Sequence, residues 1–174
     1  MSTYVYASPV GPLTLTGEDA ALTGLWFPGR GPAAPTHPDP APFTAAIAQL
    51  DAYFRGELTT FDLPLAPGGS AFRRQVWDAL TEIPYGETIS YGALAGRLED
   101  VRGEWVSPRA VGAANGANPI SIIVPCHRVI GADGSLTGYG GGLQRKQALL
   151  ELESAHRDGG PAPAVWAGRQ TSLL

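Results

Sequence analysis

Proline and glycine occur in clusters along this chain, and the clusters determine where helices and strands can form. Six of the 16 prolines fall within residues 28–42. Proline fixes φ and lacks a backbone N–H, so this segment is predicted to be an exposed connection. A second cluster at residues 67–69 is typical of a boundary between domains. We therefore divide the chain into an N-terminal domain of residues 1–69, a C-terminal domain of 70–156 and a tail of 157–174.

The N-terminal domain is predicted to contain a small antiparallel sheet and one helix. Short runs of alternating apolar and polar residues, separated by turn signals, indicate strands within residues 3–27. Apolar residues at helical spacing predict a helix over residues 43–54, which Gly56 would end. A further short strand is expected over residues 61–65.

The C-terminal domain is predicted to be mainly helical. Ser70, Ser90 and Ser107 can each cap the start of a helix, because a serine hydroxyl accepts a hydrogen bond from an N–H of the first turn. A turn joins the second and third of these helices, an arrangement typical of a helix-turn-helix. A last helix is expected from Leu143, and the apolar run at residues 120–124 is expected to form a buried strand. The two domains together predict an α/β fold of the α+β kind.

Charge and targeting signals limit the partners of the chain. The net charge is −4, and residues 1–69 carry 6 acidic but only 2 basic side chains. Because the sequence has no basic run, any DNA binding must use few phosphate contacts. The N-terminus has no signal-peptide pattern, and the apolar run at residues 120–126 is too short to cross a bilayer. We therefore expect a cytoplasmic protein with no membrane partner.

Cys126 is the only cysteine of the chain, which excludes an internal disulfide and a cysteine-rich zinc site. It follows Pro125 at the end of an apolar run and precedes His127 and Arg128. A neighbouring imidazole can take the thiol proton, and a cation favours the thiolate. A free cysteine is also common as a small buried apolar side chain. This segment alone leaves both interpretations open, and no metal site is predicted.

The predicted helix of residues 107–115 carries almost only small side chains apart from Arg109 near its start. Such a helix can pack very closely against another element of the fold. It can also enter a DNA minor groove, which is only about 6 Å wide, with the arginine as the one long side chain that reaches the base stack. The helix lacks the polar side chains that usually read bases, so the pattern leaves both interpretations open.

Several motifs follow one another between residues 72 and 153. They are Val76-Trp77, Ile83-Pro-Tyr-Gly-Glu-Thr88, Ser90-Tyr91, Arg109-Ala-Val-Gly112, Asn118-Pro119, Pro125-Cys-His-Arg-Val129, Gly138-Tyr139, Gly141-Gly142, Lys146, Leu149-Leu150 and Glu153. With these motifs the chain resembles the O6-alkylguanine-DNA alkyltransferase family, also named methylated-DNA–protein-cysteine S-methyltransferases. The N-terminal strands and the segment from Leu50 to Gly56 resemble the smaller first domain of that family more loosely.

The resemblance implies direct-reversal DNA repair without a cofactor. The alkyl group of O6-alkylguanine, and also of O4-alkylthymine, would move from a base flipped out of double-stranded DNA to Cys126 in one irreversible turnover. The family also implies a monomer whose C-terminal domain contains a winged helix-turn-helix-like DNA-binding element.

The resemblance further implies a role for each of five catalytic residues. Cys126 would accept the alkyl group, and His127 would take its proton through a water. Glu153 would orient His127, and Asn118 would brace the turn that holds the active-site segment. Tyr91 would donate a hydrogen bond to the departing base and help to rotate the nucleotide.

The remaining implied residues contact the base or the DNA. The guanine pocket would be lined by Val129, Tyr139 and Gly140 together with Tyr91. Arg109 would fill the gap that the flipped base leaves in the duplex. The small residues implied to approach the minor groove are Ala110, Gly112 and Ala113.

Two other functions use some of the same residues. A non-enzymatic lesion sensor would share the DNA-binding helix and the pocket but would lack the acceptor cysteine, and Cys126 argues against it. A cysteine hydrolase could use Cys126, His127 and Asn118, but it would not need a small-residue helix with an arginine at its start. Turnover separates the three functions: none for the sensor, one per molecule for the transferase, many for the hydrolase.

Overall fold

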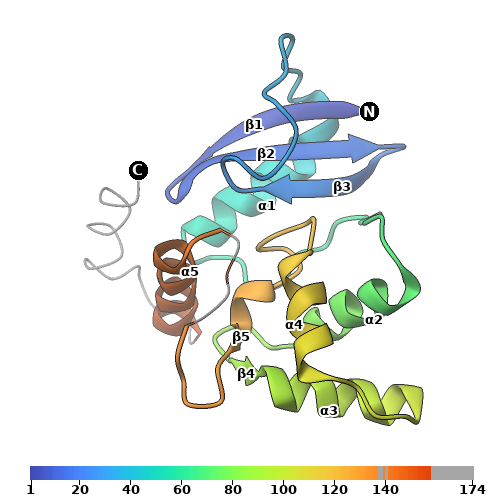
Figure 1. Cartoon of the computed structure of the whole chain (residues 1–174). Coiled ribbons are helices and arrows are strands. Elements are labelled where there is room, and N and C mark those ends of the chain that lie inside the picture. Colours follow the sequence, from blue (N-terminus) through green and yellow to red (C-terminus); the bar gives the residue numbers. More distant parts are fainter. Residues whose placement is uncertain (137–138, 140, 158–174) are drawn as a thin grey trace.

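A three-stranded antiparallel sheet and one helix form the N-terminal half of the structure, a computed structural model that describes residues 1–136, 139 and 141–157. The strands pair in sequence order, with β2 in the centre. The bounds are β1 (Ser2–Ser8), β2 (Gly11–Glu18), β3 (Ala21–Trp26), the 3₁₀ turn η1 (Ala41–Phe43) and α1 (Thr44–Phe54). Figure 1 shows α1 lying across one face of this sheet. The predicted sheet and the predicted helix are therefore confirmed.

Side chains of β1 join the sheet to α1. The ring of Tyr4 stacks on that of Phe43, and the ring of Tyr6 stacks on that of Phe54. The Tyr6 hydroxyl also donates a hydrogen bond of 2.6 Å to Asp51 on α1. The helix is thereby fixed on the sheet by both apolar and polar contacts.

The strand expected over residues 61–65 does not form. Leu65 makes one isolated bridge to Leu22 of β3, and the carbonyl of Pro64 accepts a hydrogen bond from the Leu22 N–H. A longer ladder would need N–H groups that Pro64 and Pro67 lack. The prediction was wrong because the apolar pattern of the segment does not reveal how few donors it has.

The C-terminal half is mainly helical, as predicted. Its elements are α2 (Ala71–Leu80), β4 (Ile89–Ser90), α3 (Tyr91–Arg102), α4 (Pro108–Gly116), η2 (Cys126–Arg128), β5 (Val129–Ile130) and α5 (Leu143–His156). The hydroxyls of Ser70, Ser90 and Ser107 cap α2, α3 and α4 and accept hydrogen bonds from the first turns. β4 and β5 pair in parallel over two residues each. All three predicted helix starts are confirmed.

The segment of residues 120–124 is buried, but it is a series of turns rather than the expected strand. Ile120 makes one bridge to Leu25 of β3, and the chain then bends through Ile122 at a positive φ of 73°. The Val124 N–H donates to the carbonyl of Ile120, and the Ser121 N–H donates to the carbonyl of Leu25 on β3, so the polar backbone groups find partners without a continuous ladder. Burial was predicted correctly, whereas the backbone conformation was not.

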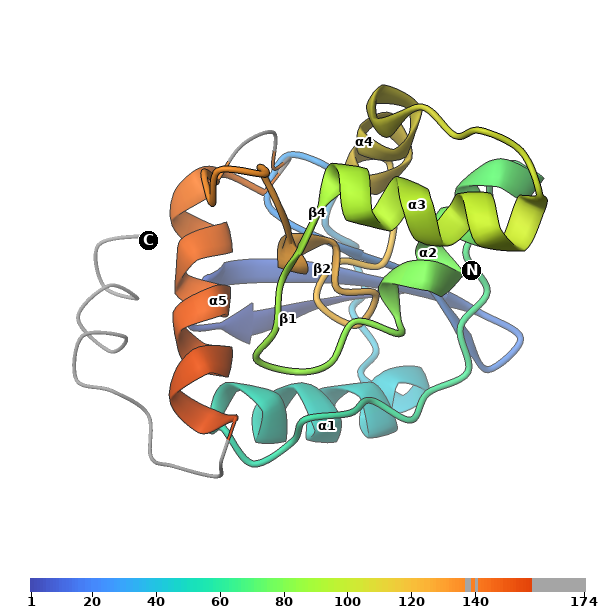
Figure 2. The same cartoon turned by 90° about the horizontal axis from the view of Figure 1, so that it is seen from below.

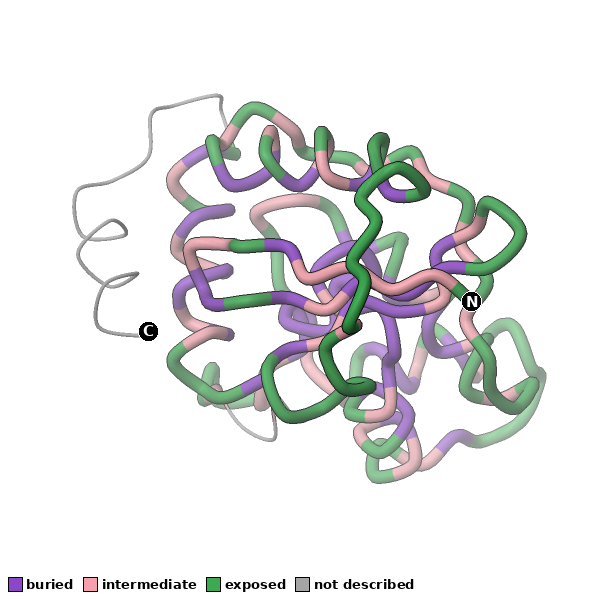
Figure 3. The backbone as a smooth tube through the Cα atoms, turned by 90° about the horizontal axis from the view of Figure 1, so that it is seen from above, coloured by how far each residue is buried: buried purple, intermediate pink, exposed green. Residues whose placement is uncertain are grey.

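The two halves share one apolar core. The buried parts of the chain converge in the middle of the molecule (Figure 3), and residues 28–42 are exposed except for Pro35. Backbone hydrogen bonds cross between the halves, as from the Leu25 N–H to the carbonyl of Pro119. The C-terminal ends of α1 and α5 lie side by side (Figure 2), with Gly56 against the ring of His156. The domain boundary at residue 69 stays a prediction, and the tail beyond residue 157 lies outside the described residues.

Candidate active site

Two asparagines hold the segment that carries Cys126. The Asn118 Nδ2 donates to the carbonyl of Val124 at 2.8 Å, and its Oδ1 accepts from the Ile120 N–H at 3.0 Å. The Asn115 Nδ2 donates to the carbonyl of Cys126 at 3.3 Å. Asn118 was identified from the motif that contains it. Asn115 was missed, because nothing within the run of small residues marks it as a contact of another segment.

Glu153 of α5 meets both residues that follow the cysteine. Its Oε2 lies 2.7 Å from the Nε2 of His127, and its Oε1 accepts from the Nε of Arg128 at 2.7 Å. Arg128 also donates from Nη1 to the carbonyl of Ile83. Arg128 was expected to favour the Cys126 thiolate, but its guanidinium binds Glu153 instead. Glu153 is only 1 % exposed.

The Glu153 carboxyl is ionised at neutral pH. Burial alone would raise its pKa, but the charges and hydrogen bonds of His127 and Arg128 outweigh this effect and lower the pKa to about 2. The carboxylate is therefore a permanent acceptor for the imidazole. The other ring nitrogen of His127, Nδ1, is buried and has no hydrogen-bond partner among the described residues.

Burial raises the pKa of the Cys126 thiol above its usual value. Hydrogen bonds of Asn118 and Tyr139 and the charge of Lys146 offset only part of this effect. The Cys126 Sγ lies 3.9 Å from the Tyr139 hydroxyl. A thiol in this environment stays protonated at neutral pH and needs a base before it can attack as a thiolate.

Lys146 was quoted among the motifs but was not predicted as a site residue. It is fully buried on α5, and its Nζ donates to the carbonyl of Val129. The ammonium also lies 5.7 Å from the centre of the Tyr139 ring. Lys146 and Glu153 are seven residues apart, about two helical turns, so they lie on the same face of α5. The spacing places Lys146 on the same face as the predicted site residue Glu153. This signal could have identified Lys146, because a lysine is rarely buried without a partner.

A small cleft opens at Cys126. Among its lining residues are Asn118 and Tyr139, together with Phe27 and Arg30 from the N-terminal half. Neither of these last two was predicted. Tyr91 is not part of this lining, and Val129 is fully buried. Gly140, the other predicted pocket residue, lies outside the described residues.

One face of α4 presents small side chains to solvent. Arg109, Ala113 and Gly116 are exposed, whereas Val111 and Ala114 are buried. The Trp77 Nε1 donates to the carbonyl of Ala114 at 2.8 Å and holds the buried face. The sequence left open whether this helix packs against the fold or faces outward. It does both, because one side is buried against α2 and the other side is exposed to solvent.

The four predicted DNA-contact residues all lie on α4. Arg109 lies in the first turn of α4, and Ala110 and Gly112 are half-buried. A methyl group added at Gly112 would lie 3.7 Å from the Tyr91 ring, an ordinary van der Waals contact, so this position of α4 faces the first residue of α3. Arg109 and Asn115 are about 9 Å apart along the helix axis, which connects the exposed arginine to the Cys126 segment through one rigid element.

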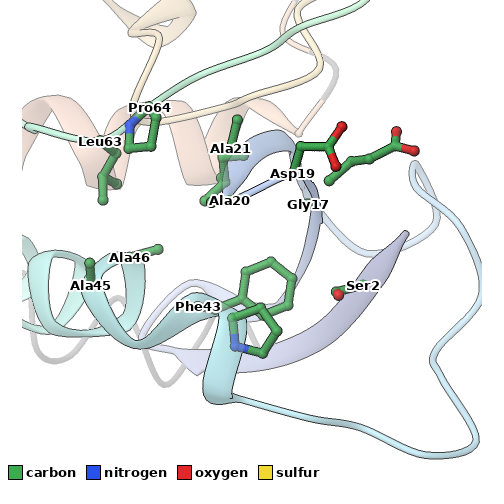
Figure 4. A pocket seen from close by; sticks show the side chains of 13 residues that line it. Ser2, Gly17, Asp19, Ala20, Ala21, Phe43, Ala45, Ala46, Leu63 and Pro64 are labelled. Atoms are coloured by element: carbon green, nitrogen blue, oxygen red, sulfur yellow. The ribbon is translucent and has the colours of Figure 1, made fainter.

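Another cavity lies between the turn after β2 and the start of α1 (Figure 4). Phe43, Ala46 and Pro64 are among the residues that line it, and none of the predicted site residues does. Among the described residues, no cluster of three or more His, Cys, Asp or Glu side chains could hold a metal ion. No helix within the described ranges has the length and apolar character needed to span a membrane.

Known proteins of one family are similar to this chain over most of its length. Two 6-O-methylguanine DNA methyltransferase models match it, the ribonuclease-like domain over residues 1–67 and the DNA binding domain over residues 71–155. The methylated-DNA–protein-cysteine methyltransferase of Mycobacterium tuberculosis strain H37Rv is 55% identical over 156 residues, which cover 85% of this chain and 89% of the relative. The protein of the same name from Methanosarcina acetivorans is 48% identical over 156 residues, which cover 87% of this chain and 97% of the relative.

Solved structures agree with these relatives. The crystal structure of Mycobacterium tuberculosis OGT in complex with DNA has a TM-score of 0.82 at 50% identity and covers 98% of this chain and 99% of that chain. An O6-methylguanine DNA methyltransferase from Methanococcus jannaschii has a TM-score of 0.63 at 28% identity and covers 88% and 90%. The predicted α/β fold and the resemblance inferred from the motifs are thereby confirmed. The chain belongs to the 6-O-methylguanine DNA methyltransferase family.

Proposed function

We propose that this chain repairs DNA by moving an alkyl group from O6 of a flipped-out guanine to the Sγ of Cys126. Its activity is the transfer of an alkyl group from methylated DNA to a protein cysteine, and Cys126 is its single cysteine. That one observation carries the assignment of the acceptor. The buried pair of His127 and Glu153, called the relay below, supports it. Glu153 contacts His127 at 2.7 Å, and His127 follows Cys126 directly.

The transfer begins with removal of the thiol proton. His127 takes it at Nδ1 through a water, while its Nε2 is held by Glu153. The Cys126 thiolate then attacks the alkyl carbon, the S–C bond forms and the C–O6 bond breaks. The electron pair of the C–O6 bond leaves with the guanine, which takes up a proton from solvent, and we assign to Tyr91 the hydrogen bond to this departing base. The thioether has no route back to a thiol, so each molecule reacts once.

The exposed face of α4 accounts for access to the base. We assign the close approach to the minor groove to Ala110, Gly112 and Ala113, and the filling of the base stack to Arg109. Flipping a nucleotide costs a few kcal/mol, and a side chain in the gap offsets part of that cost. Val129, Tyr139 and Gly140 complete the guanine pocket in this proposal.

The partner is double-stranded DNA that contains alkylated guanine. A solved relative is a complex with DNA, and the same pocket would admit O4-alkylthymine. This transfer needs no cofactor. We further propose that the protein acts as a monomer in the cytoplasm, and light scattering of the free protein at micromolar concentration tests the oligomeric state.

A labelled substrate tests the assignment of the acceptor. Duplex DNA with a radiolabelled O6-methyl group on one guanine is incubated with the protein, which is then digested and its peptides are separated. The label is expected on the peptide that contains Cys126. A Cys126→Ala variant should bind the same duplex and acquire no label. Label that remains on DNA, or that appears as free methanol, would support the sensor or the hydrolase instead.

A further inference from the structure

Tyr53 brings a hydroxyl from the N-terminal half of the chain to the relay. It lies near the end of α1, is fully buried and donates a hydrogen bond of 2.7 Å to the Oε2 of Glu153. Its ring is held by the rings of Phe54, Phe61 and Tyr85, with centres 5.2, 5.4 and 6.3 Å away. The position of the hydroxyl is therefore set by packing as well as by the hydrogen bond.

Glu153 is the point where three donor groups converge. Its Oε1 accepts from the Nε of Arg128, while its Oε2 is shared by the Nη2 of Arg128, the Nε2 of His127 and the hydroxyl of Tyr53. Tyr85 also faces this group, and its ring lies under the Arg128 guanidinium. Tyr53 and His127 contact the same oxygen of Glu153. The hydrogen bond from Tyr53 partly neutralises the negative charge of that oxygen, so less of the charge is left to stabilise a protonated imidazole.

The Tyr53 hydroxyl is a constant donor. Burial and the neighbouring Glu153 raise the pKa of Tyr53 well above its usual value, so it keeps its proton wherever the protein is folded at ordinary pH. It therefore cannot exchange protons with His127. Its effect on the relay is limited to holding and partly neutralising Glu153.

We propose that Tyr53 is a positioning residue for the alkyl transfer, acting through Glu153 on the proton affinity of His127. This inference rests on the proposed function, in which His127 takes the thiol proton. It makes the N-terminal half of the chain a contributor to the reactivity of Cys126, in addition to its role in packing.

Tyr6 offers a matched control, because its hydroxyl also bonds a carboxylate across an element boundary that involves α1. Its hydroxyl donates to Asp51 of α1 at 2.6 Å, and its side chain is 6 % exposed. Tyr6→Phe and Tyr53→Phe thus each remove one tyrosine–carboxylate hydrogen bond that involves α1. Only the second bond reaches a residue that contacts His127.

The test measures the rate of Cys126 alkylation by free O6-benzylguanine, followed by intact mass, from about pH 5.5 to about pH 9. Because the free base needs no DNA binding, the rate reports the relay and the pocket alone. Tyr53→Phe leaves more of the Glu153 charge for a protonated imidazole. We expect the rising limb of its profile to move to higher pH and the rate at neutral pH to fall by about tenfold. The Tyr6→Phe profile should coincide with that of the wild type.

Profiles of the two variants that coincide with each other would overturn the role of Tyr53. If Tyr53→Phe does not fold, 3-fluorotyrosine at position 53 keeps the shape of the ring and makes the hydroxyl a stronger donor. That substitution should move the rising limb to lower pH, and an unchanged limb would again overturn the inference. A wild-type protein that never acquires the benzyl group on Cys126 would instead contradict the proposed function.

Discussion

At the scale of single residues, Cys126 needs a base because its surroundings disfavour the thiolate. Burial raises its pKa, and the cation expected beside it from the sequence, Arg128, is bound to Glu153. Among the described residues, the positive charge of Lys146 lowers the pKa of the thiol, but by less than burial raises it. We therefore expect the hydrogen-bonded pair of His127 and Glu153 to set the rate at which the thiol reacts near neutral pH.

Replacing His127 by glutamine should slow alkylation by free O6-benzylguanine about 10²- to 10⁴-fold at neutral pH, the range of a lost general base. The loss should shrink as the pH rises, because the thiol then ionises without help at its raised pKa. His156→Gln is the control. His156 of α5 is buried like His127, but among the described residues its ring hydrogen-bonds only to the carbonyl of Leu152. Equal losses in the two variants would contradict the role of His127.

Glu153 should also make stability depend on pH. Its pKa in the folded state is about 2, below its ordinary value of 4.5, so its ionised form stabilises the fold. This contribution is fully present above about pH 4.5 and is lost as the pH falls towards 2. In urea unfolding, the difference in free energy between the wild type and Glu153→Gln should be larger at pH 7 than at about pH 3. A difference that does not change with pH would show that the carboxylate charge is not what stabilises the fold.

At the scale of elements, the proposed DNA contact and the proposed chemistry involve opposite ends of α4. Arg109 is exposed at its start, and Asn115 near its end bonds the Cys126 carbonyl. Arg109→Ala should therefore slow repair of duplex DNA far more than reaction with free O6-benzylguanine. Arg55→Ala removes another exposed arginine, at the end of α1, and should change neither rate. Equal losses on both substrates would contradict the filling of the base stack by Arg109.

The exposed small face of α4 allows a second test. Ala113→Leu adds bulk on the solvent side, so the melting temperature should stay within a few degrees of the wild type. Duplex binding should weaken about tenfold or more, because the added side chain keeps the helix out of a groove about 6 Å wide. Ala48→Leu makes the same change on the exposed side of α1, and fluorescence anisotropy should show unchanged binding. Binding of Ala113→Leu equal to that of the control would exclude this face as the DNA contact.

Local signals predicted the helices better than the irregular segments. The hydroxyls of Ser70, Ser90 and Ser107 start helices by accepting hydrogen bonds from N–H groups three residues later. Because the interaction is local, the serine and the residues that follow it are enough to predict the helix start. The turns of residues 120–124 depend on the side chain of Asn118 and on the contact with β3. An apolar pattern contains neither piece of information, and the same pattern suits a buried strand.

At the scale of the whole molecule, the site is assembled from parts far apart in the chain. Motifs identified Cys126, His127 and Glu153 together, because the family resemblance includes all three. Tyr53 could not be assigned to the site in this way, since it reaches Glu153 only when α1 packs against α5, 100 residues later. Its neighbours in sequence indicate only an apolar helix face. The contact between Tyr53 and Glu153 therefore follows from tertiary packing and from no sequence motif.

The halves are also joined around the site by hydrogen bonds to backbone carbonyls. The Leu25 N–H donates to the carbonyl of Pro119, and the Nε of Arg145 on α5 donates to the carbonyl of Val10. Phe27 and Arg30 follow β3 and line the cleft at Cys126. The segment after β3 therefore forms one part of the cleft lining, and the end of α4 contributes Asn115 and Gly116 to another.

Each molecule of this protein is proposed to react once, at Cys126. A fixed amount of protein is mixed with an excess of duplex DNA carrying O6-methylguanine, and the repaired guanines are counted until the reaction stops. Repair should stop at about one lesion per protein molecule, with the intact mass of the protein raised by one methyl group. Continued repair beyond one lesion per molecule, or repair without that gain in mass, would contradict the account.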